Sequence, residues 1–129
     1  MAYYISTTLN RPFDESIEEV TRALQAEGFG VLSDIDVKAT MKKKLDIDYH
    51  NYRILGACNP PYAHRALEAE HMIGTLLPCN VIVQEREAGY IEIAAVDPVS
   101  SMGAVNNESI IPIAEEIRQK LERVIQSLK

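Results

Sequence analysis

Cysteine is scarce in this sequence, and long apolar runs and an excess of basic residues are missing. Two cysteines among 129 residues are too few for the disulfide framework of a small secreted domain, so we expect both thiols to be reduced. No stretch approaches the roughly 20 apolar residues that a membrane-spanning helix needs. The sequence begins MAYYISTTLNRPFDE, without the basic and apolar segments of a secretion signal. These absences predict a soluble, cytoplasmic protein with no membrane partner.

The charge balance argues against another class of partner. Lysine and arginine total 13 and aspartate and glutamate total 19, which gives a formal charge of −6. Nucleic-acid binding needs a basic footprint, so we expect no nucleic-acid partner. The one basic cluster lies on a short predicted helix, where such a cluster is typical of a solvated face. Its members are Lys38, Lys42, Lys43 and Lys44.

Recognisable catalytic motifs are also missing. The sequence has no GxSxG, P-loop, dinucleotide-binding fingerprint, HExxH or paired CxxC motif. Glu68 and His71 do have the E-x-x-H spacing of di-iron bundles, and His64 precedes them on the same predicted helix. Because those bundles need a second matching motif, which this sequence lacks, we interpret the three side chains as a solvated face. We therefore expect no metal, no cofactor and no complete catalytic set.

What the chain does contain is the composition of an ordinary globular domain. It is 47% hydrophobic and 25% charged, which is typical of that class. A chain of this length buries roughly two-thirds of its unfolded surface, enough for a core of its own. We expect a single domain over residues 1–129.

Hydrophobic periodicity predicts five strands and two long helices. Gly28, in a left-handed conformation, is expected to end the first long helix. At the start of this helix either Asp14 or the Ser16–Glu19 pair is expected to provide the cap. Asp36 is expected to cap a short helix, and Asn59 a further helix that begins with Pro60 and runs to about His71. The predicted strands cover residues 3–9, 29–35, 52–57, 81–84 and 90–96, and the long helices residues 14–27 and 110–128.

The element order, βαβ(α)β(α)ββα, favours an α+β fold. Strands joined by short insertions predict a largely antiparallel five-stranded sheet with the two long helices on one face. In the last strand Ile91 and Ile93 alternate with Ala94 and Val96, so both faces should be covered, and we expect a homodimer. The face away from the helices is a natural surface for a partner subunit or a ligand. It is expected to carry Tyr4, Ser6, Thr8, Leu32, Asp34, Asn80, Ile82, Gln84, Glu92 and Ala94.

Three segments carry a resemblance to a known family. They are GFGVLSDIDV at 28–37, YRILGACNP at 52–60 and LLPCNVIV at 76–83. Together they resemble domain of unknown function family 302, over nearly the whole chain. The resemblance implies a small bacterial or archaeal α+β protein with an antiparallel sheet and no established activity. It also implies that Asn59 and Pro60 are a more general feature of the family than the two cysteines.

Two Cys-Asn pairs are the candidate binding residues. Cys58-Asn59 ends one predicted strand just before a helix N-terminus, and Cys79-Asn80 begins the next strand. A helix N-terminus lowers a thiol pKa and attracts anions. If the two strands are antiparallel, the pairs converge; if they are parallel, the pairs lie at opposite ends of the sheet. The competing interpretation is that both cysteines are small buried hydrophobic residues.

Two functional hypotheses follow from these residues. The first is a non-enzymatic binding or interaction protein, working as a homodimer, with a small ligand or anion at the Cys58-Asn59-Pro60 helix N-terminus. The second is an enzyme or carrier that handles sulfur species or a soft metal with a reactive Cys58 and with Cys79 as resolving thiol or co-ligand.

Overall fold

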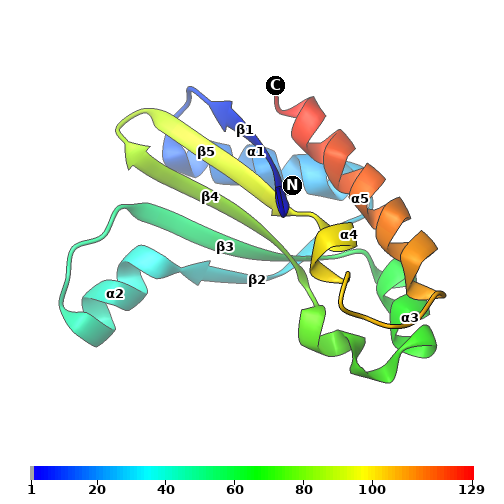
Figure 1. Ribbon diagram of the computed structural model, residues 1–129. Coiled ribbons are helices and arrows are strands. Elements are labelled where there is room, and N and C mark those ends of the chain that lie inside the picture. The colour runs from blue at the N-terminus through cyan, green and yellow to red at the C-terminus, as the bar shows by residue number, and fades with distance from the viewer. Residues whose placement is uncertain (1) are drawn as a thin grey trace.

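The computed structural model describes residues 2–129 and has one antiparallel sheet with strand order β1-β5-β4-β3-β2. Every pair of neighbouring strands is antiparallel, so the predicted α+β fold is confirmed. Figure 1 shows the arrangement. The elements in chain order are β1 (Tyr4–Leu9), α1 (Phe13–Ala26), β2 (Gly30–Asp36), α2 (Val37–Leu45), β3 (Asn51–Cys58), α3 (Pro60–Ala69), the 3-10 helix η1 (His71–Leu76), β4 (Cys79–Glu87), β5 (Tyr90–Val96), α4 (Pro98–Ser101) and α5 (Ile110–Ser127).

Helices α1 and α5 pack side by side on one face of the sheet, as the sequence predicted (Figure 1). The core lies between them and the sheet, because each element turns its apolar residues to this face. Val20 and Leu24 of α1 are fully buried there, as are Ile91 and Ile93 of β5. Helix α5 contributes the longest apolar stripe: Ile110, Ile113, Ala114, Ile117, Leu121, Val124 and Ile125 are all buried.

The start of α1 differs from the predicted one. Pro12 occupies the cap position and no side chain caps the helix. The hydroxyl of Ser16 is fully buried and donates to the carbonyl oxygen of Pro12 at 3.0 Å, so it is not available as a cap. The other end is as predicted, since Gly28 has a φ of 87° and its N–H donates to the carbonyl oxygen of Gln25 at 3.0 Å.

Two further helix boundaries test the capping predictions. Asp36 does cap α2, accepting from the N–H of Ala39 at 3.0 Å. Helix α3 ends at Ala69, and His71 begins η1, so the prediction that one helix carries both Glu68 and His71 was wrong. After β5 the chain forms one helical turn, α4, which Asp97 caps.

A β-bulge in β2 corrects the predicted face of this strand. The register shifts between Val31 and Ser33, so Leu32 is the extra residue and the later side chains change face. Asp34 pairs with Leu55, whose side chain is 1% exposed in the core. Asp34 therefore lies on the helix face, where it binds Arg53, and Ile35 lies on the other face instead of Asp34.

Among residues 2–129, no helix is long and apolar enough to span a bilayer.

Candidate functional site

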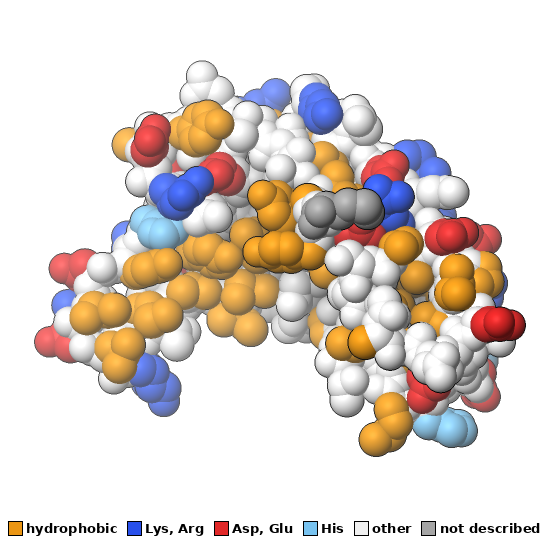
Figure 2. Space-filling model, viewed as in Figure 1, with side chains coloured by type: hydrophobic (Ala, Val, Ile, Leu, Met, Phe, Trp, Pro, Cys, Tyr) orange, Lys and Arg blue, Asp and Glu red, His pale blue; other side chains and the backbone are white. Residues whose placement is uncertain are grey.

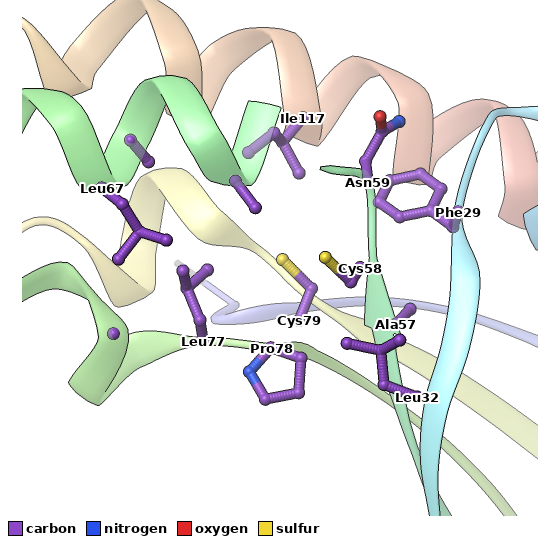
Figure 3. A pocket seen from close by; sticks show the side chains of 13 residues that line it. Phe29, Leu32, Ala57, Cys58, Asn59, Leu67, Leu77, Pro78, Cys79 and Ile117 are labelled. Atoms are coloured by element: carbon purple, nitrogen blue, oxygen red, sulfur yellow. The ribbon is translucent and has the colours of Figure 1, made fainter. Parts of the chain in front are cut away.

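A pocket of about 310 Å³ lies at the end of the sheet, where β3 ends and β4 begins. Helix α3 and Ile117 of α5 lie above it in the view of Figure 3, and the 3-10 helix η1 lies at one side. Its walls are almost entirely apolar, and its size falls in the range of small-molecule sites in proteins. The lining residues are Phe29, Leu32, Ala57, Cys58, Asn59, Ala63, Ala66, Leu67, Gly74, Leu77, Pro78, Cys79 and Ile117.

Both cysteines line this pocket. The register of β3 and β4 pairs Ala57 with Cys79, and Cys58 is the next residue of β3. Opposed Cα atoms in antiparallel strands are about 5 Å apart and successive ones about 3.4 Å, which puts the Cα atoms of the two cysteines about 6 Å apart. Cys58 is the last residue of β3, and the side chains of both cysteines enter the same pocket (Figure 3). The antiparallel arrangement thus brings the thiols to one place, as the sequence predicted for this topology. Both are free, with Cys58 half-buried and Cys79 buried.

The environment of Cys79 favours its neutral thiol. Its residue is 5% exposed, and burial, together with the nearby Cys58, raises the pKa of Cys79 to about 11. The thiolate is the form that attacks sulfur and binds soft metals. At neutral pH Cys79 is therefore a small apolar wall of the pocket, which is how the competing interpretation described it.

The side chain of Asn59 joins the end of α1 to the start of α3 but does not cap α3. It occupies the cap position, with φ −105° and ψ 98°, and its side chain makes no capping hydrogen bond. Its Nδ2 instead donates to the carbonyl oxygen of Glu27 at 3.1 Å. The residue is 7% exposed, so this bond ties the end of α1 to the start of α3 inside the protein. The prediction of a side-chain cap at Asn59 was wrong.

The N-terminus of α3 offers few donors to an anion. Pro60 and Pro61 have no N–H, and the N–H of Ala63 already donates to the carbonyl oxygen of Asn59 at 2.9 Å. Within the first turn only Tyr62 is left with a free backbone donor. An anion site at a helix end relies on several convergent N–H groups, so this end of the pocket favours an uncharged ligand.

Asn80 lies away from the other candidate residues. Successive strand residues point to opposite faces, and because Cys79 is buried beneath the helices, Asn80 is exposed on the far face. There it borders a second hollow, of about 540 Å³, together with Tyr52 and Arg86. The two Cys-Asn pairs thus converge through their cysteines and Asn59 only. No group of three or more His, Cys, Asp or Glu side chains that could hold a metal ion occurs within residues 2–129.

The sequence did not reveal the apolar part of the site. Ala63, Ala66 and Leu67 of α3 have helical spacing and were expected to face inward, but that spacing is equally typical of a filled core. Gly74 has no side chain, and a Cβ built there would meet only Leu67 Cδ2, at 3.9 Å. The space left at Gly74 is part of the pocket, and no pattern in the sequence signals it.

Comparisons with known proteins agree with the fold. A crystal structure of an uncharacterised conserved protein from Bacillus stearothermophilus, described as DUF302, is similar to this chain with a TM-score of 0.91 and 28% sequence identity, and the match covers 100% of both chains. No curated protein matches the chain. The family model "Domain of unknown function DUF302" matches residues 5–128. The chain therefore belongs to the DUF302 family.

Proposed function

We propose that this protein binds a small, uncharged and mainly apolar molecule in the pocket at the end of β3 and β4. The observation that carries the proposal is the pocket itself: about 310 Å³ of space with apolar walls, which the chain's own side chains leave unfilled. The pocket is a hollow that opens to the surface, since Leu32 and Leu67 among its lining residues are 71% and 42% exposed. A mainly apolar concavity of this size is typical of small-molecule sites.

The chemistry of the walls supports this ligand class. Leu67, Leu77 and Ile117 offer methyl groups, and the neutral thiol of Cys79 adds a polarizable apolar surface. Asn59 is the one amide among the lining residues, and its Nδ2 is already used by Glu27. A charged ligand would lose its hydration here without gaining a partner.

A titration with toluene, followed through the methyl NMR signals of the full chain, tests this proposal. We expect saturable shifts of the methyl signals of Leu67, Leu77 and Ile117. The methyl signals of Ile54 and Ile82, on the far face of the sheet, serve as the internal control and should stay in place. Shifts confined to the far face, or no shift up to the solubility limit of toluene, would contradict the proposal.

The alternative function, thiol chemistry at Cys58 and Cys79, requires a different property of the same pocket. A reactive pair needs a thiolate at neutral pH, and the raised pKa of Cys79 opposes this for one partner. Cys58 is half-buried, so we expect it to react with an aromatic disulfide reagent in the folded protein no faster than a free thiol does. If Cys58 reacts faster than a free thiol at neutral pH, and the thiol of Cys79 then displaces the reagent's thiol to form a Cys58–Cys79 disulfide, the thiol alternative is the better account.

We also propose that the protein works as a homodimer. The support is the face of the sheet opposite to α1 and α5, which no helix within residues 2–129 covers (Figure 1). This face lies away from the buried walls of the pocket, so ligand binding and dimer formation are separately testable.

A further inference from the structure

The uncovered face of the sheet, called the open face below, carries an apolar row across four strands. The strand registers pair Ile35 with Ile54, Ile54 with Ile82, and Ile82 with Ala94. These four residues are the central row. All four are half-buried or exposed in the single chain. A row of large apolar side chains open to water is a feature of surfaces that bind a partner.

Charge is nearly absent from the open face. The row on one side of the central row pairs Tyr52 with Gln84 and Gln84 with Glu92. Glu92 is the charged member, and Arg86 neutralises it through two hydrogen bonds of 2.6 and 2.8 Å. A quarter of the residues of the whole chain are charged. Low charge at the centre with polar groups at the rim is the composition of a protein interface.

Helix α2 and the loop after it form an arm at the edge of this face, called the α2 arm below (residues 37–49). No residue of α2 is buried, and Leu45 and Ile47 are 63% and 44% exposed. A helix of this length has little stability unless an apolar face packs on something. Figure 2 shows hydrophobic side chains along the arm and across the adjoining open face, above a hollow in the surface.

The total surface of the chain is large for its mass. A compact monomer of 14.4 kDa exposes about 6,800 Å², whereas this chain exposes 7703 Å². The excess, about 900 Å², is close to the roughly 800 Å² that each partner contributes to a standard protein interface. Part of the exposed surface is apolar and lies on the open face and the α2 arm, where Ile35, Leu45 and Ile47 are 49%, 63% and 44% exposed.

We infer that a second copy of this chain covers the open face, with the two central rows facing each other and each α2 arm packed on its partner. This rests on the proposed homodimer and adds the surface that forms it. A two-fold axis through Ile82 would bring identical patches together, which is how symmetric dimers close.

The test is light scattering with the full chain and three variants, over a dilution series that starts at tens of micromolar and gives the dimer dissociation constant of each. The wild type should have twice the mass of one chain. Ile82→Asp places a charge at the centre of the interface and should raise the dimer dissociation constant about a hundredfold or more. Leu45→Asp in the α2 arm should raise it about tenfold. The matched control is Ile111→Asp, at a 54% exposed position of α5, which should leave the mass unchanged.

Each result is decisive once circular dichroism shows that the variants are folded. A monomeric wild type overturns both the homodimer and this interface. A dimeric wild type whose dissociation constant Ile82→Asp leaves unchanged keeps the homodimer and overturns the open face as its interface. A dimer whose dissociation constant rises with Ile82→Asp but not with Leu45→Asp overturns the role of the α2 arm. Toluene binding in the pocket does not depend on any of these outcomes.

Discussion

At the residue scale, Cys79 should make stability depend on alkaline pH. Burial raises the pKa of Cys79 to about 11, whereas a cysteine of an unfolded chain titrates near about 8.5. Between these values the unfolded state has lost its proton and the folded state keeps it, so the free energy of unfolding falls as the pH rises. The contribution is fully present below about pH 8.5 and amounts to about 3 kcal/mol in all.

Urea denaturation of the wild type and Cys79→Ala, at pH 8 and at pH 10.5, checks this dependence. Tyrosine and lysine side chains titrate in the same range in both proteins, so the difference between the two pH slopes isolates the thiol. The wild type should lose more stability than the variant over this interval. Equal slopes would mean that Cys79 is hydrated in the folded state.

Substitutions at Asn59 can distinguish a helix cap from the observed bond to Glu27, because the two need different side-chain atoms of Asn59. A capping side chain accepts a hydrogen bond, and aspartate accepts as well as asparagine. The observed bond instead needs the N–H of Asn59, which donates to the carbonyl oxygen of Glu27. Asn59→Asp should therefore be destabilising by about 1–3 kcal/mol, no less than Asn59→Ala. Chemical denaturation measures both, and a stability of Asn59→Asp equal to that of the wild type would restore the capping interpretation.

At the element scale, the close approach of β2, β3 and β4 depends on Gly56. A Cβ at this position would lie 2.3 Å from the Oγ of Ser33 and 2.8 Å from the Cγ of Pro78. Gly56→Ala should therefore lower the free energy of unfolding by about 1–3 kcal/mol. Thermal or chemical denaturation is the measurement.

A second substitution identifies the contact responsible for the loss at Gly56. Ser33→Ala removes the hydroxyl and leaves a Cβ that is 3.6 Å from the added methyl group. In the background of Gly56→Ala it should recover part of the lost stability, and the ring of Pro78 should keep the remainder. A fully additive double mutant would show that Ser33 does not carry the clash.

The elements themselves were largely predictable, and the exceptions have physical reasons. The cap Asp36 acts locally and was predicted from its own sequence. Asp97 was not predicted as a cap, because its helix has a single turn, which is too short to show a periodic pattern. The bulge at Leu32 was not predictable. The stretch from Phe29 to Val37 alternates in either register, and the choice depends on the pairing of β2 with β3.

Of the candidate site, the sequence predicted the positions of the two cysteines but not the tertiary contacts around them. The positions of Cys58 and Cys79 at the adjoining ends of two strands follow from an antiparallel sheet, which the sequence favoured. The role of Asn59 did not follow, because its partner Glu27 is 32 residues away in sequence. The unfilled volume beside Gly74 depends on how α3 and η1 sit over the strand ends, and tertiary packing of this kind leaves no periodic signal.

At the scale of the whole molecule, the two faces of the sheet differ in what covers them. The helix side holds the core and, at its end, the pocket, and the open face is the surface that we propose for a second copy. Because the pocket walls come from β3, β4, α3, η1 and α5, ligand binding should tighten the contact between these elements. Toluene should therefore raise the melting temperature, and the rise should grow with its concentration.

The most direct measurement is the affinity for toluene of two variants at one position of the pocket wall. Gly74→Ala adds a Cβ that has room and serves as the backbone control, whereas Gly74→Leu adds a side chain long enough to occupy the space. By methyl NMR titration we expect Gly74→Ala to bind like the wild type and Gly74→Leu to bind at least about tenfold more weakly, with both variants folded. Equal toluene affinity in the wild type and Gly74→Leu would contradict ligand binding in this pocket.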